Sequence, residues 1–131
     1  MATNLTTKEL GKYGEDLALR FLQDKGYRIL ERNFKNKIGE IDLVVQDART
    51  ICFVEVKTRK SLACGQPFES VHYHKQRKLV QVALSYLKYK FHTIEVPARF
   101  DVISIYQDEG GQGHIQHIPS AFDLTYLYGR R

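Results

Sequence analysis

Two neighbouring apolar segments, residues 39–45 and 51–57, constrain the fold more than any other part of the chain. Each segment is typical of a buried β-strand, and the short polar break between them predicts an antiparallel hairpin. Charged side chains nevertheless occur inside both segments, at Asp42, Glu55 and Lys57. Burying an ionised carboxylate is costly unless a cation or strong hydrogen bonds compensate it. The hairpin therefore predicts a site where opposite charges converge.

The second segment has the pattern of a central strand. Because side chains alternate along a strand, one face carries Ile51, Phe53, Glu55 and Lys57, and the other carries Cys52, Val54 and Val56. Both faces begin apolar, which predicts a strand that is covered on both sides. The charged residues appear only toward its C-terminal end. On the preceding strand, Glu40, Asp42 and Val44 are expected to share a face.

The N-terminal part of the chain predicts a helix that starts at Thr6 and stops at Gly26. Thr6 followed three residues later by Glu9 is the capping-box pattern, and glycine is a common helix stop. Gly11 and Gly14 inside this helix suggest that another backbone approaches closely. Glu15 lies at helical spacing from residues on the packed side.

The rest of the chain predicts an α-β-β-β-α-β-β order, with no internal repeat or long linker. A mixed sheet flanked by helices, an α/β or α+β domain, is the class that such an order favours. The expected elements after the first helix are strands at 27–32, 39–45 and 51–57, a helix at 74–88, strands at 98–106 and 114–118, and a terminal helix at 120–128.

Composition narrows the class of protein. A chain of 131 residues with 43% hydrophobic residues is a typical size for one domain, 1–131, with a real core. The net charge of +5 favours a polyanionic partner. Two cysteines, Cys52 and Cys64, are too few for a disulfide framework and favour a reduced, intracellular protein. The sequence shows no signal core and no membrane-spanning run, so a cytoplasmic location without membrane contact is expected.

The charged residues of the hairpin suit metal-dependent phosphate chemistry. Magnesium prefers hard oxygen ligands and usually keeps several waters, so Asp42, Glu55 and a backbone carbonyl are suitable ligands. Such a metal polarises a phosphodiester and lowers the pKa of a bound water. Lys57 projects from the same strand face as Glu55, where it can orient the attacking water or stabilise negative charge. Glu15 adds a third carboxylate if its helix packs across the site.

Each of these residues also has an ordinary structural interpretation. Glu55 and Lys57 can form an ion pair at an exposed strand end, and Asp42 can belong to a polar turn that enters a strand. Glu15 can be a solvated helix charge. Asp101 can be a further acid of the centre, but a buried aspartate bonded to neighbouring backbone or to Arg99 is the favoured interpretation.

Motifs along most of the chain resemble the YraN family of small bacterial proteins. That family belongs to the PD-(D/E)XK nuclease-like superfamily, beside archaeal Holliday-junction resolvases. The resemblance rests on segments that are weak singly but specific together and in order: Gly11-Lys-Tyr-Gly14-Glu15, Gly39-Glu-Ile-Asp42-Leu, Phe53-Val-Glu55-Val-Lys57-Thr-Arg59, Lys75-Gln76-Arg77-Lys78 and Arg99-Phe-Asp101-Val.

The resemblance implies a restriction-endonuclease-like fold and phosphodiester hydrolysis with Mg²⁺ or Mn²⁺. The two acids of the superfamily signature correspond to Asp42 and Glu55, which implies that these residues hold the metal. The signature lysine corresponds to Lys57, and the early helical glutamate of resolvase-like members corresponds to Glu15. Ile41 stands where the signature has proline, at a position that varies in the superfamily. Nuclease-like folds also host proteins that do not cleave.

Basic residues near the expected site fit a nucleic-acid groove. Their contacts with phosphates would give salt-sensitive and largely sequence-independent binding. Gln76 is a candidate to support a metal-bound water. The candidate nucleic-acid-binding residues are Lys35, Lys37, Arg59, Lys60, Lys75, Gln76, Arg77 and Lys78.

Three functional hypotheses follow. The leading one is a nuclease that acts on structured or branched DNA, with DNA favoured over RNA, and a homodimer is expected if it resolves branches by two coordinated cuts. The second is a non-catalytic nucleic-acid-binding module that works with a DNA repair or recombination partner, such as a helicase. The third is a small protein-interaction domain with a vestigial site.

Overall fold

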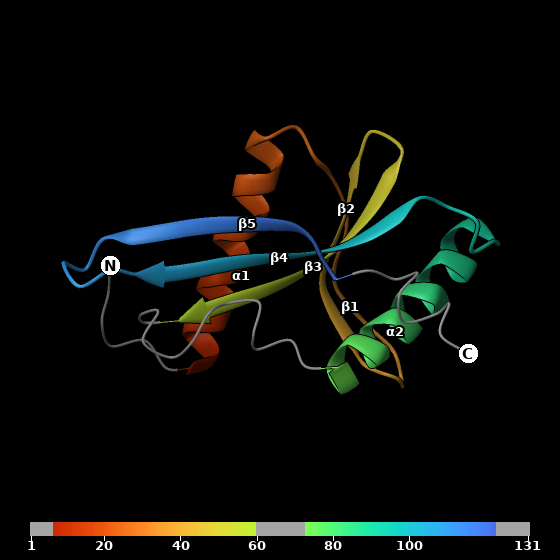
Figure 1. The fold of residues 1–131 in the computed structure, drawn as a ribbon, viewed down its shortest axis with the longest axis horizontal. Helices are drawn as coiled ribbons and strands as arrows, with labels where there is room; N and C mark the ends of the chain where they lie inside the picture. The colour runs from red at the N-terminus through yellow and green to blue at the C-terminus, as the bar shows by residue number, and fades with distance from the viewer. Residues whose placement is uncertain (1–6, 60–72, 123–131) are drawn as a thin grey trace.

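The computed structural model describes residues 7–59 and 73–122. In this part of the chain, a five-stranded sheet with the order β1-β2-β3-β4-β5 is flanked by two helices (Figure 1). The β3–β4 pair is parallel and the other pairs are antiparallel. The predicted mixed α+β fold is therefore confirmed. The elements are α1 (Thr7–Asp24), β1 (Arg28–Lys35), β2 (Glu40–Asp47), β3 (Thr50–Arg59), α2 (Tyr73–Phe91), β4 (Ala98–Gln107) and β5 (Gly113–Phe122).

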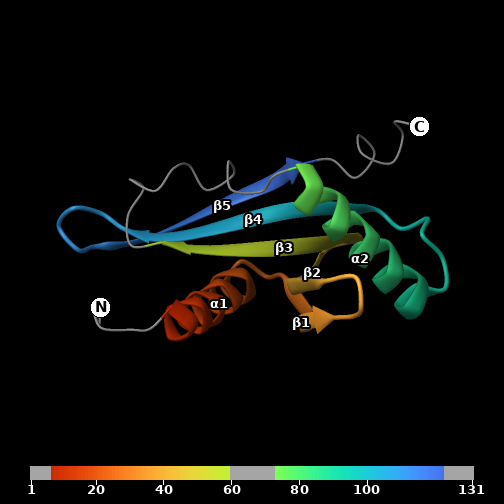
Figure 2. The ribbon, with the colours of Figure 1, turned by 90° about the horizontal axis from the view of Figure 1, so that it is seen from below.

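β3 is the central strand, and its two faces pack against different helices. Ile51 and Phe53 belong to a core cluster with the apolar side of α2. Cys52 and Val54 belong to a second cluster with Ala18 and other residues of α1. Because neighbouring strand residues point to opposite faces, α1 and α2 lie on opposite sides of the sheet. Figure 2 shows α1 on one side of β3, β4 and β5. The predicted alternation along β3 is therefore confirmed.

The end of α1 has the backbone pattern of a Schellman motif. Gly26 has φ of +91°, which is a left-handed conformation that glycine adopts readily. The Gly26 amide donates to the Gln23 carbonyl, and the Tyr27 amide donates to the Leu22 carbonyl. Glycine at this position thus ends the helix and turns the chain into β1, as the sequence predicts. The predicted N-cap, Thr6, lies outside the described residues.

The close approach predicted for the helical glycines occurs at only one of them, and it involves a side chain rather than a backbone. A Cβ at Gly14 would lie 1.9 Å from Oγ1 of Thr58, so this glycine lets α1 sit against β3. A Cβ at Gly11 would meet nothing within 4 Å among the described residues. Gly11 therefore borders open space.

The C-terminal region differs from the prediction. Residues 120–122, predicted to begin a helix, belong to β5, and the remaining part of that predicted helix lies outside the described residues. Pairing with β4 explains the longer strand, because Phe122 is registered with Phe100 and their rings stack at 4.6 Å. Neither α1 nor α2, the helices of the described segments, is long and apolar enough to cross a membrane.

Candidate functional site

The site forms where β2 and β3 separate. The last registered pair toward the start of β2 is Leu43 with Val54. Beyond it, Ile41 packs in the α2-side cluster although Leu43 packs in the α1-side cluster, so the alternation of β2 breaks between them. Asp42 lies at this break, and its Oδ2 accepts a hydrogen bond of 2.8 Å from the Val56 amide. The carboxylate thus satisfies a backbone donor that lies beyond the last registered β2–β3 pair.

Glu55 is the buried acid on the α2 side of β3, with 7% of its surface exposed. Its Oε2 lies 2.6 Å from Nζ of Lys75, in the first turns of α2, and 3.9 Å from Nζ of Lys57. The shorter distance makes Lys75 the stronger partner. The pairing of Glu55 with Lys57 that the sequence suggests is therefore present but loose, and Lys75 supplies the close cation.

Asp42 and Glu55 form an acid pair. Burial, the charge of Glu55 and a hydrogen bond to Glu55 together raise the pKa of Asp42 to about 8. The Val56 amide opposes this shift. Two carboxylates at such short range cannot easily both be ionised. The pair is thus poised to take up either a proton or a cation.

Lys57 is a lysine with an unusually low proton affinity. Burial and the hydrogen bond with Lys75 together lower its pKa to about 8, although the charge of Glu55 opposes the shift. The pKa of Lys75 is raised instead, because its contacts with Glu55 and Lys57 outweigh the effect of burial. An amine with a pKa near neutrality can exchange protons at physiological pH, which is the property that acid–base catalysis requires.

Glu15 reaches the site from the other face of the sheet. It lies on α1, and its charge is among the causes that raise the pKa of Asp42. Burial also raises the pKa of Glu15, with Arg32 opposing and Glu40 adding to the shift. In the amide orientation that satisfies its neighbours, Asn33 donates to Oε1 of both Glu15 and Glu40 at 3.2 Å. Glu15 therefore lies beside the acid pair and acts on it electrostatically.

The residues predicted to bind nucleic acid fall in three places. Lys35 and Lys37 are exposed at the β1–β2 connection, and Arg59 ends β3. Gln76, Arg77 and Lys78 follow Lys75 on α2, with Arg77 and Lys78 exposed. Lys60 lies outside the described residues. Lys75 was predicted to contact phosphates, and the structure places it inside the acid cluster. Sequence periodicity could not find this contact, because Glu55 and Lys75 lie on different elements and are 20 positions apart in the sequence.

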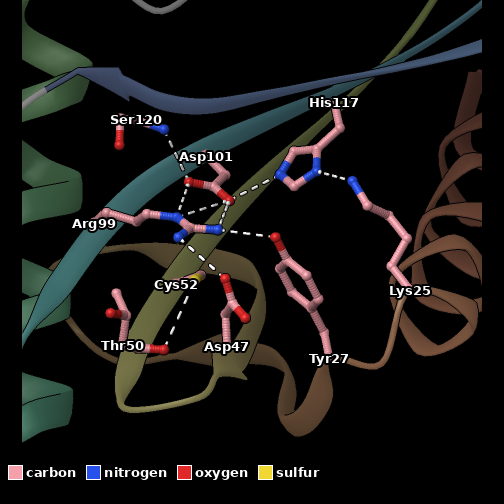
Figure 3. A network of polar contacts seen from close by, with 9 residues as sticks. All are labelled: Lys25, Tyr27, Asp47, Thr50, Cys52, Arg99, Asp101, His117 and Ser120. Atoms are coloured by element: carbon pink, nitrogen blue, oxygen red, sulfur yellow. Dashed lines mark hydrogen bonds and ion pairs between the residues drawn. The ribbon is translucent and has the colours of Figure 1, made fainter.

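Asp101 belongs to a separate network on the α1 side of the sheet (Figure 3). Arg99 Nε donates to Oδ1 of Asp101 at 3.0 Å, and the Ser120 amide donates to the same oxygen at 3.1 Å. His117 lies 2.8 Å from Oδ2 through Nε2. These bonds lower the pKa of Asp101 against the effect of burial. The favoured interpretation of Asp101 as a structural aspartate is therefore confirmed, while sequence reasoning missed His117.

His117 is held in one tautomer by its neighbours. The Lys25 ammonium donates to Nδ1 at 3.0 Å, which assigns the ring hydrogen to Nε2, facing Asp101. Arg99 Nη2 also donates to the Tyr27 hydroxyl at 2.9 Å. The network thus joins the end of α1 to β4 and β5. The only sequence signal for it was the charged Asp101 inside an apolar strand.

The donor set of the acid pair fits a small divalent cation. Within residues 7–59 and 73–122, no cluster of three or more His, Cys, Asp or Glu side chains is close enough to hold a metal ion. Magnesium, however, is commonly held by one or two carboxylates, with waters and substrate phosphates as the other ligands. Asp42 and Glu55 are two such oxygen donors, and a cation between them would remove the repulsion that raises the pKa of Asp42.

The fold and the site together define a small mixed α+β protein with two acids and two lysines clustered at the separation of two central strands. The model of the family described as "Uncharacterised protein family UPF0102" matches residues 14–105, and the chain belongs to this family. The matched segment includes the four site residues that the sequence predicted. The predicted resemblance to the YraN family is thereby confirmed, whereas membership of the nuclease-like superfamily stays a prediction.

Relatives from different bacteria align over nearly their whole lengths. A UPF0102 protein of Geobacter metallireducens is 48% identical over 94% of this chain and 99% of its own length. A UPF0102 protein of Geotalea uraniireducens is 46% identical, with 91% and 93% covered. A third, from Persephonella marina, is 45% identical, with 88% and 95% covered. These relatives therefore share most of the length of this chain.

Proposed function

We propose that this protein is a metal-dependent nuclease that cleaves phosphodiester bonds in structured or branched DNA. The observation that carries the proposal is the pairing of the half-buried Asp42 carboxyl with the buried Glu55 carboxyl beside Lys57, whose pKa is lowered to about 8. Strongly perturbed groups that gather at one place are typical of catalytic sites. The positive net charge of the chain supports a polyanionic substrate.

Each residue has a distinct role in this proposal. Asp42 and Glu55 would hold Mg²⁺ or Mn²⁺, which when bound supplies Lewis-acid polarisation of the scissile phosphate. The hydrogen bond from the Val56 amide fixes the direction of the Asp42 carboxylate. Lys57 orients or deprotonates the attacking water, and Lys75 stabilises negative charge on the phosphate. Glu15 adds negative potential beside Asp42.

A cleavage panel tests the proposal. Linear, flapped, forked and four-way DNA substrates are incubated with Mg²⁺ or Mn²⁺ and the wild-type, Asp42→Asn or Lys57→Ala protein. We expect cleavage of at least one branched substrate and a loss of about 100-fold or more in each variant, the usual cost of removing a central catalytic group. Lys88→Ala, at an exposed position near the end of α2, is the matched control for a lost lysine charge. Cleavage that persists in both site variants would refute the assignment.

One observation favours a second function, a DNA-binding module without catalysis. Lys75 already compensates Glu55 at 2.6 Å, so the acid cluster is partly neutralised by the chain itself. A site that has lost its metal would keep such an ion pair and the basic surroundings. Salt-sensitive DNA binding that is unchanged in an Asp42→Ala/Lys57→Ala double variant, with no cleavage of any substrate, would establish this function and exclude the first.

A further inference from the structure

A groove of about 420 Å³ lies beside the acid pair, on the α1 side of the sheet. Its walls come from α1, β1 and the start of β2, and Glu15 connects it to the site because the charge of Glu15 acts on Asp42. The lining residues are Lys8, Gly11, Lys12, Glu15, Arg32, Asn33 and Glu40. Of these, only Glu15 was a candidate site residue in the sequence.

The groove exists because of the helical spacing along α1. Lys8, Gly11, Lys12 and Glu15 are three, four and seven residues apart, so they share one face of the helix. Gly11 leaves the middle of this face without a side chain, and a Cβ there would meet nothing within 4 Å in the described part of the chain. The absence of a side chain at Gly11 therefore keeps the groove open.

The groove is lined by both positively and negatively charged side chains. Lys8 and Lys12 supply ammonium groups along the helix, whereas Arg32 is already engaged in an ion pair with Asp16. Glu15, on the same face of α1, and Glu40, at the start of β2, supply carboxylates that both accept hydrogen bonds from the Asn33 amide. A ligand that fits both walls carries an anionic group and, a few atoms away, a hydrogen-bond donor. A nucleotide with an exocyclic amino group on its base has both.

The volume sets the size of the ligand. Pockets of roughly 300–1,000 Å³ hold single small molecules, so an open groove of about 420 Å³ has room for one nucleotide. Enzymes that modify a base show that one unstacked nucleotide can enter such a pocket and be bound at its base edge by hydrogen bonds. An unpaired nucleotide next to the acid pair matches the volume of the groove, the charges of its lining residues and its position beside the site.

We infer that the α1 groove binds one unpaired nucleotide of the DNA strand that enters the site. Lys8 and Lys12 contact its phosphate, and Glu40 accepts a hydrogen bond from the exocyclic amino group of adenine or cytosine. This inference rests on the proposed function, since the ligand is part of the same DNA substrate. It adds that the substrate carries a single-stranded segment beside the bond that is cut.

Binding of labelled oligonucleotides in EDTA tests the groove independently of cleavage. The variant Gly11→Leu fills the groove without changing any charge, and it should keep the fold because leucine is a better helix former than glycine. We expect single-stranded DNA to bind about tenfold more weakly, which corresponds to the lost contacts of one nucleotide, while a blunt duplex hairpin binds as in the wild type. Equal binding of single strands by Gly11→Leu and wild type would overturn the inference.

Two further comparisons test the lysines and the Glu40 carboxylate separately. Lys8→Ala/Lys12→Ala should weaken single-strand binding and make the log–log salt dependence shallower by about 1, whereas the matched pair Lys88→Ala/Lys90→Ala at the far end of α2 should change both far less. Glu40→Gln should reduce a preference for oligodeoxyadenylate and oligodeoxycytidylate over oligodeoxythymidylate. Equal effects of the two lysine pairs, or no base preference in the wild type, would contradict the inference.

The outcomes also separate this inference from the proposed function. Single-strand binding that depends on Gly11 and Lys12, in a protein that cleaves nothing, would keep the groove and reject the nuclease. Cleavage that requires Asp42 and Lys57 but is indifferent to Gly11→Leu would keep the nuclease and reject the groove.

Discussion

Two aspartates, the half-buried Asp42 and the buried Asp101, occupy similar backbone positions and have opposite electrostatic surroundings. Each lies where a strand ladder is interrupted, and each accepts a hydrogen bond from a backbone amide left over at the interruption, Val56 for Asp42 and Ser120 for Asp101. Asp101 also faces Arg99 and His117, so its pKa is lowered. Asp42 faces another carboxyl, so its pKa is raised to about 8.

The difference distinguishes a structural carboxylate from one that is suited to chemistry. The oxygens of Asp101 are bonded to a guanidinium, an imidazole and a backbone amide, so the chain itself compensates the buried charge. The chain offsets the repulsion between Asp42 and Glu55 only in part, through Lys75 beside Glu55 and the Val56 amide beside Asp42. Protonation or an added cation relieves the remainder. A ligand gains the most binding free energy where it compensates a charge that the protein itself leaves partly uncompensated.

The largest expected effect is the loss of stability on replacing Asp101, the structural aspartate. Asp101→Ala leaves the half-buried Arg99 side chain, the buried His117 side chain and the Ser120 amide without their shared acceptor. We expect the free energy of unfolding to fall by about 3–5 kcal/mol, the cost of breaking a buried ion pair from one side. Urea unfolding at pH 7, followed by circular dichroism, measures this loss. Asp108→Ala removes an aspartate from an exposed turn and is the control, for which little change is expected.

Removing the carboxyl charge of Asp42 should change the stability in the opposite direction. In the metal-free protein, the pKa of Asp42 is about 8 when folded and near 3.8 when unfolded. Between these values the folded state binds more protons, so stability is fully present at low pH and is lost as pH rises toward 8. Asp42→Asn, an uncharged carboxyl substitute, should therefore be more stable than wild type by about 2 kcal/mol near pH 8.

Unfolding titrations of both proteins from pH 5 to 7.5 in EDTA check this sign. The difference between Asp42→Asn and wild type should grow with pH, because only the folded wild type keeps a proton on Asp42 that the unfolded chain releases. The effect of Asp101 falls in another window: its lowered pKa contributes stability above about pH 3.8 that is lost only as the pH falls further. A variant that is less stable than wild type at every pH would show that Asp42 is a structural residue like Asp101.

The sequence predicted that Asp42, Glu55 and Asp101 lie in apolar strands, but it did not predict which side chains surround each of them. The apolar runs around Asp42, Glu55 and Asp101 located the strands, and their alternation placed Glu55 and Lys57 on one face of β3. Alternation assigns a side chain to a face without naming the residue that it meets from another element. The contact of Lys75 with Glu55 and that of His117 with Asp101 both depend on the packing of separate elements. The groove at Gly11 depends on how α1 lies across β1 and β2.

The smallest of the three effects concerns the lysine that occupies the acid pair. Lys75 Nζ lies 2.6 Å from Glu55 Oε2, so it competes with any cation that binds the same oxygen. Lys75→Met keeps much of the side-chain volume and removes this charge, and we expect the dissociation constant for Mn²⁺ to fall about fivefold, a modest change because the lysine is partly exposed. Calorimetric titration measures it, with Lys78→Met, one turn along α2 and exposed, as the control. If Lys75→Met bound Mn²⁺ no better than Lys78→Met, the carboxyl pair would not be the cation site, and Asp42 would lose the role that separates it from Asp101.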